Sequence, residues 1–117
     1  MNVWTFTGRI GRDAEQRFTA SGDSVVNFNV AVDSGFGDKK QTTWPRCAIF
    51  GKRGSSLVGY LTKGALVAVS GEPTLREWED GEGARRVSLE VRVAEVTLLG
   101  SKERAFAYLL IPGGTES

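Results

Sequence analysis

The chain has 117 residues, 40% of them hydrophobic, which is enough for one domain with its own core and too little for two. Its 15 Lys and Arg residues and 14 Asp and Glu residues give a net charge of +1, so bulk charge does not indicate nucleic-acid binding. One cysteine and no histidine exclude an intramolecular disulfide, a zinc site of the usual composition and a Ser-His catalytic pair. With no signal-peptide pattern and no run near the ~18 apolar residues of a membrane span, we expect a cytoplasmic protein without membrane contact, cofactor or metal.

Alternating apolar and polar residues predict three strands in the first half of the chain. The first starts near Trp4 and runs to a glycine-flanked break at residues 8–11, the second covers 24–33, and the third, after a loop at 34–41, covers 42–51. The second strand is the clearest, because Val26, Phe28 and Val30 fall on one face. We expect Pro45 to interrupt regular pairing in the third strand.

A short helix and two further strands are predicted in the second half. The spacing of Leu57, Tyr60 and Leu61 predicts the helix over residues 55–62, with Ser55 or Ser56 as its N-cap. Strands at 65–79 and 85–99 follow, joined by a glycine-containing hairpin turn at 80–83. Three strands, one helix and two strands form the layout of an all-β, five-stranded OB-fold barrel with a short helix between strands three and four. The predicted domain covers residues 1–100, and residues 101–117 form a short C-terminal extension.

No residue pattern supports catalysis. Cys47 lies in the middle of a predicted strand with no imidazole to activate it, so we expect it to fill space in the core. Lys52 precedes Gly54, whereas a Walker phosphate loop needs lysine directly after its second glycine. The acidic residues at 77–82 resemble a solvated hairpin tip more than a metal or acid/base site. We therefore expect a protein that is not an enzyme.

Aromatic residues next to basic residues are the main functional signal. The pairs are Trp44 with Arg46, Phe50 with Lys52 and Trp78 with Arg76, and Phe36 lies in the loop after the second strand. Proteins that bind single strands without sequence preference use aromatic rings on which bases stack and cations that neutralise phosphate. The alternative for each ring is the barrel core. Phe50 fits either place, whereas the polar neighbours of Trp44 and Trp78 favour exposure.

Six segments in order resemble the bacterial and phage single-stranded DNA-binding protein family. They are GRIGRD at 8–13, VNFNVAV at 26–32, TWPRCAIFGK at 43–52, YLTKG at 60–64, VSGE at 69–72 and LREW at 75–78. The resemblance implies a DNA-wrapping OB-fold that forms a homo-oligomer, more often a tetramer than a dimer. It implies base stacking on Trp44, Phe50 and Trp78, with Phe36 near a further stacking position of the family. The basic positions that it implies are Arg46, Lys52, Lys63 and Arg76, together with Arg9 and Arg12 in the turn after the first strand.

The chain also departs from this family. Glu77 stands where the family often has a basic residue, and Pro45 follows Trp44. The family ends in a linker and an acidic tip that recruits other proteins, but no acidic tip is present here, so such recruitment is not expected. The apolar run at residues 105–111 should be buried, as an added strand or helix on its own barrel or a neighbouring subunit, or as a docking segment for another protein.

The expected function is therefore to bind single-stranded DNA and coat it during replication, recombination or repair, with little sequence preference. Two alternatives stay open. An OB-type interaction module of a primosome-like complex, with weak strand affinity, would agree with the near-neutral charge and Glu77. An oligosaccharide-binding barrel would use similar aromatic rings but gives no reason for the neighbouring arginines.

Overall fold

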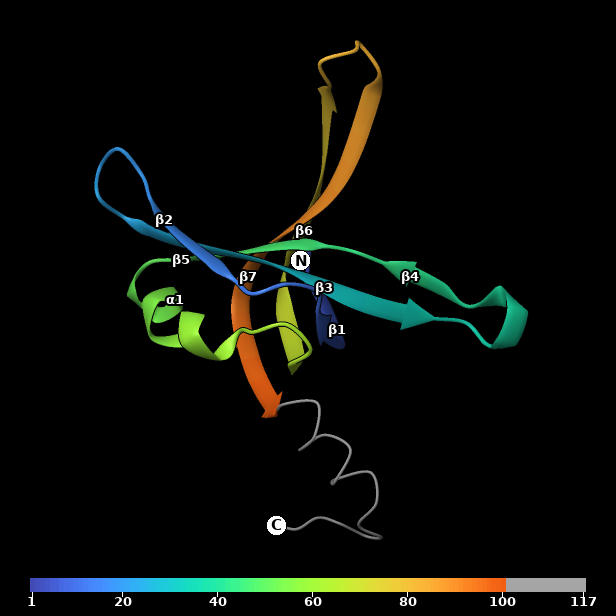
Figure 1. Cartoon of the computed structure of the whole chain (residues 1–117), viewed down its shortest axis with the longest axis horizontal. Helices are drawn as coiled ribbons and strands as arrows, with labels where there is room; N and C mark the ends of the chain where they lie inside the picture. Colours follow the sequence, from blue (N-terminus) through green and yellow to red (C-terminus); the bar gives the residue numbers. More distant parts are fainter. Residues whose placement is uncertain (101–117) are drawn as a thin grey trace, which may run out of the picture.

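The computed structural model describes residues 1–100, and the predictions for residues 101–117 lie outside this part. Its elements are β1 (Trp4–Ile10), β2 (Glu15–Phe18), β3 (Ser24–Ser34), a 3₁₀ turn (Gly37–Lys39), β4 (Gln41–Thr43), β5 (Arg46–Phe50), α1 (Lys52–Leu57), a second 3₁₀ turn (Val58–Tyr60), β6 (Leu66–Glu79) and β7 (Arg85–Gly100) (Figure 1). The five predicted strands correspond to β1, β3, β5, β6 and β7. The short strands β2 and β4 both pair with β3.

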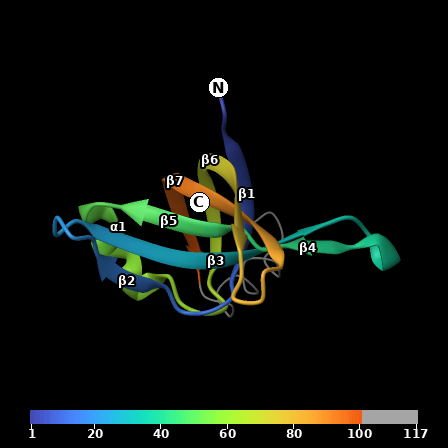
Figure 2. The same ribbon diagram turned by 90° about the horizontal axis from the view of Figure 1, so that it is seen from above.

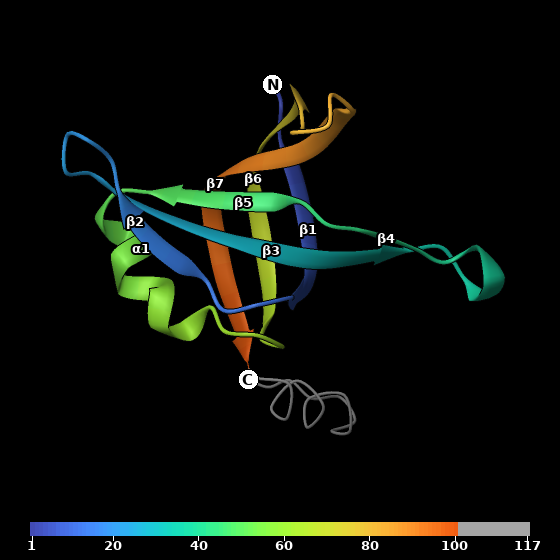
Figure 3. The same cartoon turned by 45° about the horizontal axis from the view of Figure 1, so that its top comes forward.

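The sheet closes into a barrel. Its strands follow the order β1-β6-β7-β5-β3, and β3 returns to β1 through the pairs Arg9↔Ala31 and Ile10↔Val30. All neighbours are antiparallel except β5 and β7, which pair in parallel from Arg46↔Glu90 to Ala48↔Arg92. Figure 3 shows β5 beside β3 and crossing over β7 and β6. This all-β arrangement with one helix after the third principal strand confirms the predicted fold class.

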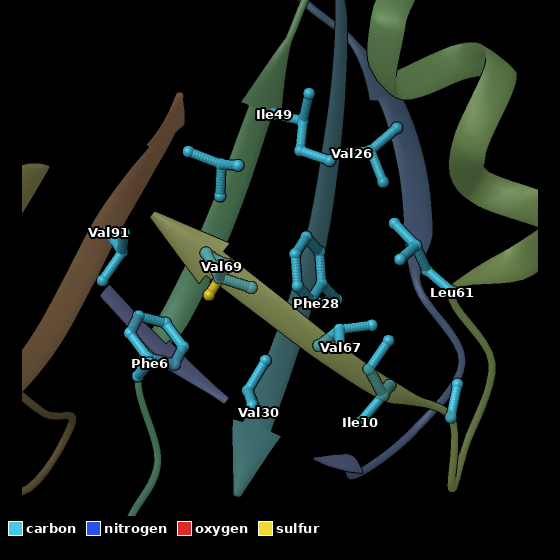
Figure 4. Packing of buried hydrophobic residues seen from close by; sticks show 13 residues of the cluster. Phe6, Ile10, Val26, Phe28, Val30, Ile49, Leu61, Val67, Val69 and Val91 are labelled. Atoms are coloured by element: carbon cyan, nitrogen blue, oxygen red, sulfur yellow. The ribbon is translucent and has the colours of Figure 1, made fainter. Parts of the chain in front are cut away.

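The core fills the barrel with side chains from β1, β3, β5, β6 and β7 (Figure 4). The predicted inward face of the second strand is confirmed, because Val26, Phe28 and Val30 are all buried. Ile49 from β5 and Val69 from β6 lie in the same cluster. Since successive side chains of a strand point to opposite faces, burying this set turns Asn27 and Asn29 outward.

The first strand differs from its sequence prediction, whereas the third agrees with the expectation for Pro45. The first strand continues to Ile10, beyond the expected break at Gly8, because Thr7, Gly8 and Arg9 remain paired with β6. The third strand is divided where Pro45 was expected to interrupt it: β4 ends at Thr43 and β5 begins at Arg46.

The helix start at Ser55 or Ser56 was wrong. Helix α1 begins at Lys52, and its N-cap is Gly51, whose φ of 91° turns the chain directly out of β5. Ser55 lies inside the helix, where its hydroxyl donates a hydrogen bond to Ser24 Oγ over 3.1 Å.

Two hairpin arms project from the barrel (Figure 1). The outer halves of β6 and β7 form one arm, which stays paired to Glu79↔Arg85. The ends of β3 and β4 form the other arm, which extends away from the barrel in Figure 2. Within residues 1–100, neither α1 nor the 3₁₀ turns are long and apolar enough to cross a membrane.

Candidate nucleic-acid interface

A groove of about 490 Å³ lies on the outer face of the barrel, over β5 and its neighbours. Its lining residues are Arg17, Asn27, Arg46, Ala48, Phe50, Thr74, Arg76, Glu90, Val91 and Arg92. They come from β2, β3, β5, β6 and β7, so the groove depends on the closed barrel and not on any one segment.

Strand alternation sets the lining of the groove. Cys47 and Ile49 of β5 are buried in the core, which turns Arg46, Ala48 and Phe50 outward. In β7 the buried Val91 and Val93 likewise turn Glu90 and Arg92 outward. The parallel register then places Arg46 opposite Glu90 and Ala48 opposite Arg92.

The groove is strongly basic although the chain as a whole is nearly neutral. Four of its lining residues are arginines and one is acidic. The side chain of Arg17 is held by Asn27, because Arg17 Nε donates a hydrogen bond to Asn27 Oδ1 over 3.1 Å. The guanidinium carbon of Arg92 lies 4.6 Å from the centre of the Phe50 ring, a cation-π contact. Positive charge is therefore concentrated beside an aromatic ring.

All four aromatic residues predicted to stack are exposed. Phe50, for which the sequence left core and surface open, has 47% of its surface exposed and lines the groove. Trp44 is 52% exposed, and Trp78 is 43% exposed on the β6–β7 arm. Phe36 is 91% exposed beside the 3₁₀ turn that ends the β3–β4 arm. The structure thus brings Phe50 together with the arginines and places Trp78 and Phe36 on the arms.

A second depression adjoins the groove. Its lining residues are Arg12, Asp13, Glu15, Asn27, Phe28, Asn29, Arg46 and Cys47. It shares Arg46 and Asn27 with the first groove, so the two form one continuous surface. The Trp44 ring lies against Gly11, where an added Cβ would be only 2.6 Å from Trp44 Cζ3. Because Gly11 precedes Arg12 in the chain, Trp44 lies close to the part of this surface that Arg12 lines.

Gly11→Ala tests the position of Trp44. The new methyl group cannot fit against the indole ring, so the ring must move. We expect a shift in tryptophan emission and a loss of oligo-dT affinity of up to about 1 kcal/mol, roughly fivefold. Gly59→Ala is the control, since a Cβ at Gly59 meets no atom within 4 Å. Unchanged emission and affinity in Gly11→Ala would show that the ring position does not matter.

Three predicted basic residues lie outside both depressions. Arg9 is partly buried and donates a hydrogen bond to the Gly64 carbonyl oxygen over 3.0 Å. Lys52 is the exposed first residue of α1, and Lys63 is exposed, with its backbone N–H bonded to Asp13. Their contact with DNA stays a prediction.

Two groove arginines were missed by the sequence analysis. Arg92 alternates with Val91 and Val93, so its outward position could have been predicted from this pattern. Arg17 lies in β2, a four-residue strand without a buried residue, and no periodic signal marks it.

Cys47 and Asp80, two of the residues considered for catalysis, have structural roles. Burial raises the pKa of the Cys47 thiol to about 12, so the reactive thiolate does not form near neutral pH. The Asp80 carboxylate closes the hairpin turn by accepting hydrogen bonds from Arg86 Nε and from the N–H groups of Glu82 and Ala84, and these bonds lower its pKa. Among residues 1–100, no three His, Cys, Asp or Glu side chains are grouped in a way that could hold a metal ion.

An OB-fold barrel with an aromatic, arginine-rich groove on its outer face defines a class of small nucleic-acid-binding proteins. Comparison with known proteins narrows this class, because residues 1–99 match the single-strand binding protein family. The chain therefore belongs to that family, whose function is to bind single-stranded DNA without catalysis. The resemblance predicted from the sequence and the prediction of a non-enzymatic protein are confirmed.

Individual relatives agree with this assignment. Single-stranded DNA-binding protein 1 of Chlorobaculum tepidum is 35% identical over 109 residues, which cover 88% of this chain and 67% of the relative. The single-stranded DNA-binding protein of Thermotoga maritima is 40% identical over 100 residues, covering 81% and 71%. A solved complex of Plasmodium falciparum SSB with ssDNA is similar to the structure with a TM-score of 0.72, at 24% identity over 85% of this chain and 95% of the other. The last likeness supports the fold.

Proposed function

We propose that the chain coats exposed single-stranded DNA during replication, recombination or repair, and that the strand runs along the groove over β5 and on toward Trp44. The observation that carries this proposal is the set of four arginines around the exposed Phe50 ring. Guanidinium groups neutralise phosphates, and aromatic rings stack with any base. Neither contact reads base identity, so little sequence preference follows.

The two arms extend the proposed binding surface. Trp78 is two residues beyond Arg76 on β6 and therefore shares the outward face that lines the groove. Phe36 lies on the other arm, beyond the pairing of Ser34 with Gln41. We infer that a long strand contacts the barrel first and the arms in addition, so longer oligonucleotides should bind more tightly than short ones.

Fluorescence anisotropy with labelled oligo-dT, oligo-dC and oligo-dA tests the proposal. We expect saturable binding of similar strength for the three strands, weaker at higher salt, and poor competition by duplex DNA. No binding by the folded protein at low salt would overturn it and favour the alternative of an interaction module with weak strand affinity.

We also infer a homo-oligomer, a tetramer rather than a dimer. Strand β1 pairs with β6 along Trp4–Arg9, but it pairs with β3 only at Arg9 and Ile10. Within the described part of the chain, the other edge of β1 from Trp4 to Gly8 has no strand partner. Unpaired strand edges are ready sites for pairing with another chain. Exposed Leu75 and Val87 on the β6–β7 arm offer further apolar surface.

The oligomer has a direct test. Light scattering after size-exclusion chromatography should give four times the 12.7 kDa mass of the chain. A mass of two chains would contradict the tetramer, and the mass of one chain would contradict any stable oligomer. The cytoplasmic location expected from the sequence remains a proposal, consistent with a single cysteine that is buried.

A further inference from the structure

Glu90 is the acidic residue in a groove lined by four arginines. It lies on β7, opposite Arg46 on one side and opposite Thr74 on the other. Its carboxylate oxygen Oε2 is 3.7 Å from Arg76 Nη1 and accepts a hydrogen bond from Ser88 Oγ over 3.4 Å. The carboxylate therefore already occupies the surroundings of an arginine that faces the groove.

The ion pair between Arg76 and Glu90 contributes little to the stability of the fold. Its Arg76 side chain is 65% exposed and its Glu90 side chain 36% exposed. Exposed pairs of this kind contribute little to folding, because solvent screens the charges and two long side chains must be ordered. In contrast, the effect on a bound strand is direct. A phosphate that approaches Nη1 of Arg76 competes with the carboxylate, and a phosphate at any other N–H group of Arg76 still meets this negative charge in the same groove.

We propose that Glu90 is an internal competitor for phosphate, which weakens single-strand binding at the groove and speeds release of the strand. The inference rests on the proposed function, since it concerns the same groove. Glu90 would thereby allow bound DNA strands to exchange. Its carboxylate pairs with Arg76 when no phosphate is present, and it repels the phosphate that takes its place on Arg76. Glu90 is thus a residue that sets affinity, not one that holds the DNA.

The variant Glu90→Gln removes the charge and keeps the shape and an acceptor for Ser88. We expect oligo-dT to bind about 2- to 10-fold more tightly at low salt, mainly through slower dissociation. The effect is of this size because a single negative charge, partly screened by salt, is removed from beside the strand. The salt dependence should steepen, because Arg76 becomes available to a phosphate. Glu95→Gln is the matched control: the same charge is removed from an exposed position of β7 that does not line the groove.

A double variant tests whether Glu90 acts through Arg76. In an Arg76→Gln background, Glu90→Gln should lose most of its effect, and the two changes should be clearly non-additive. A full gain in this background would overturn competition at Arg76. Melting curves of all variants establish that each is folded.

The outcomes separate this inference from the proposed function. If neither the wild-type protein nor Glu90→Gln binds oligo-dT, the proposed function fails. If the wild-type protein binds and Glu90→Gln binds equally or more weakly, the competitor role fails.

Discussion

Replacing Trp44 with alanine should weaken oligo-dT binding by about 1–3 kcal/mol, roughly 5- to 150-fold. The ring is half exposed, lies against Gly11, and stands beside the depression lined by Arg12 and Arg46. A base stacked there would be held between the indole and nearby guanidinium groups. Because stacking is tolerant of base identity, the loss should be similar for oligo-dT, oligo-dC and oligo-dA. Equilibrium titration of each strand gives the comparison.

Two variants serve as controls for Trp44→Ala. Trp44→Phe keeps a flat ring and should retain most of the affinity. Trp4→Phe changes the half-buried tryptophan that packs 4.2 Å from Phe6, centre to centre, and should leave binding nearly unchanged. An unchanged affinity in Trp44→Ala, or a loss limited to one base, would contradict stacking at this position.

Replacing Arg46 with glutamine should have the second large effect. Arg46 lines both depressions and is therefore the arginine at their junction. Losing one phosphate contact should reduce the slope of log affinity against log salt by about 0.7, the value for one charge on a single strand. Affinity at low salt should fall as well, whereas the difference from wild type should shrink as salt rises. Titrations at four or more salt concentrations measure the slope.

The control for Arg46→Gln is Arg53→Gln. Arg53 lies on α1, outside both depressions, and its guanidinium donates a hydrogen bond to the Val93 carbonyl oxygen over 3.3 Å. This variant has the same change in net charge, so a global charge effect would appear in both. Equal slopes in Arg46→Gln and the wild-type protein would show that Arg46 makes no phosphate contact.

Much of the fold follows from alternation in the sequence. Val26, Phe28 and Val30 repeat every second residue and enter the core, and the glycine-rich turn at 80–83 joins two long strands. The same rule places Arg46 and Phe50 outside once Cys47 and Ile49 are inside. These predictions depend on local pattern, which the sequence contains.

Other features depend on contacts between distant segments. The four residues of β2 have no buried face and form a strand because they pair with β3, so Arg17 could not be placed from the sequence. The parallel register of β5 and β7 brings Arg46 beside Glu90, which lies 44 positions away in the chain. The helix start failed for a local reason, since Gly51 turns the chain earlier than the serines that favour N-caps.

The distribution of charge likewise depends on contacts between distant segments and could not be predicted from the sequence. A net charge of +1 gave no support for strand binding, yet four arginines from β2, β5, β6 and β7 meet in one groove. Acidic residues elsewhere are engaged locally: Asp80 closes its turn and Glu77 pairs with Arg85 over 3.3 Å. Folding, not composition, produces the basic surface.

The proposed binding mode depends above all on bases that stack on the exposed tryptophans of this barrel. The most direct test is tryptophan fluorescence of the Trp4→Phe variant, in which Trp44 and Trp78 alone report, during titration with oligo-dT at two salt concentrations. Stacking predicts strong, saturable quenching that needs more DNA at the higher salt. A folded variant whose emission stays constant while an independent anisotropy titration shows bound DNA would contradict stacking on these two residues.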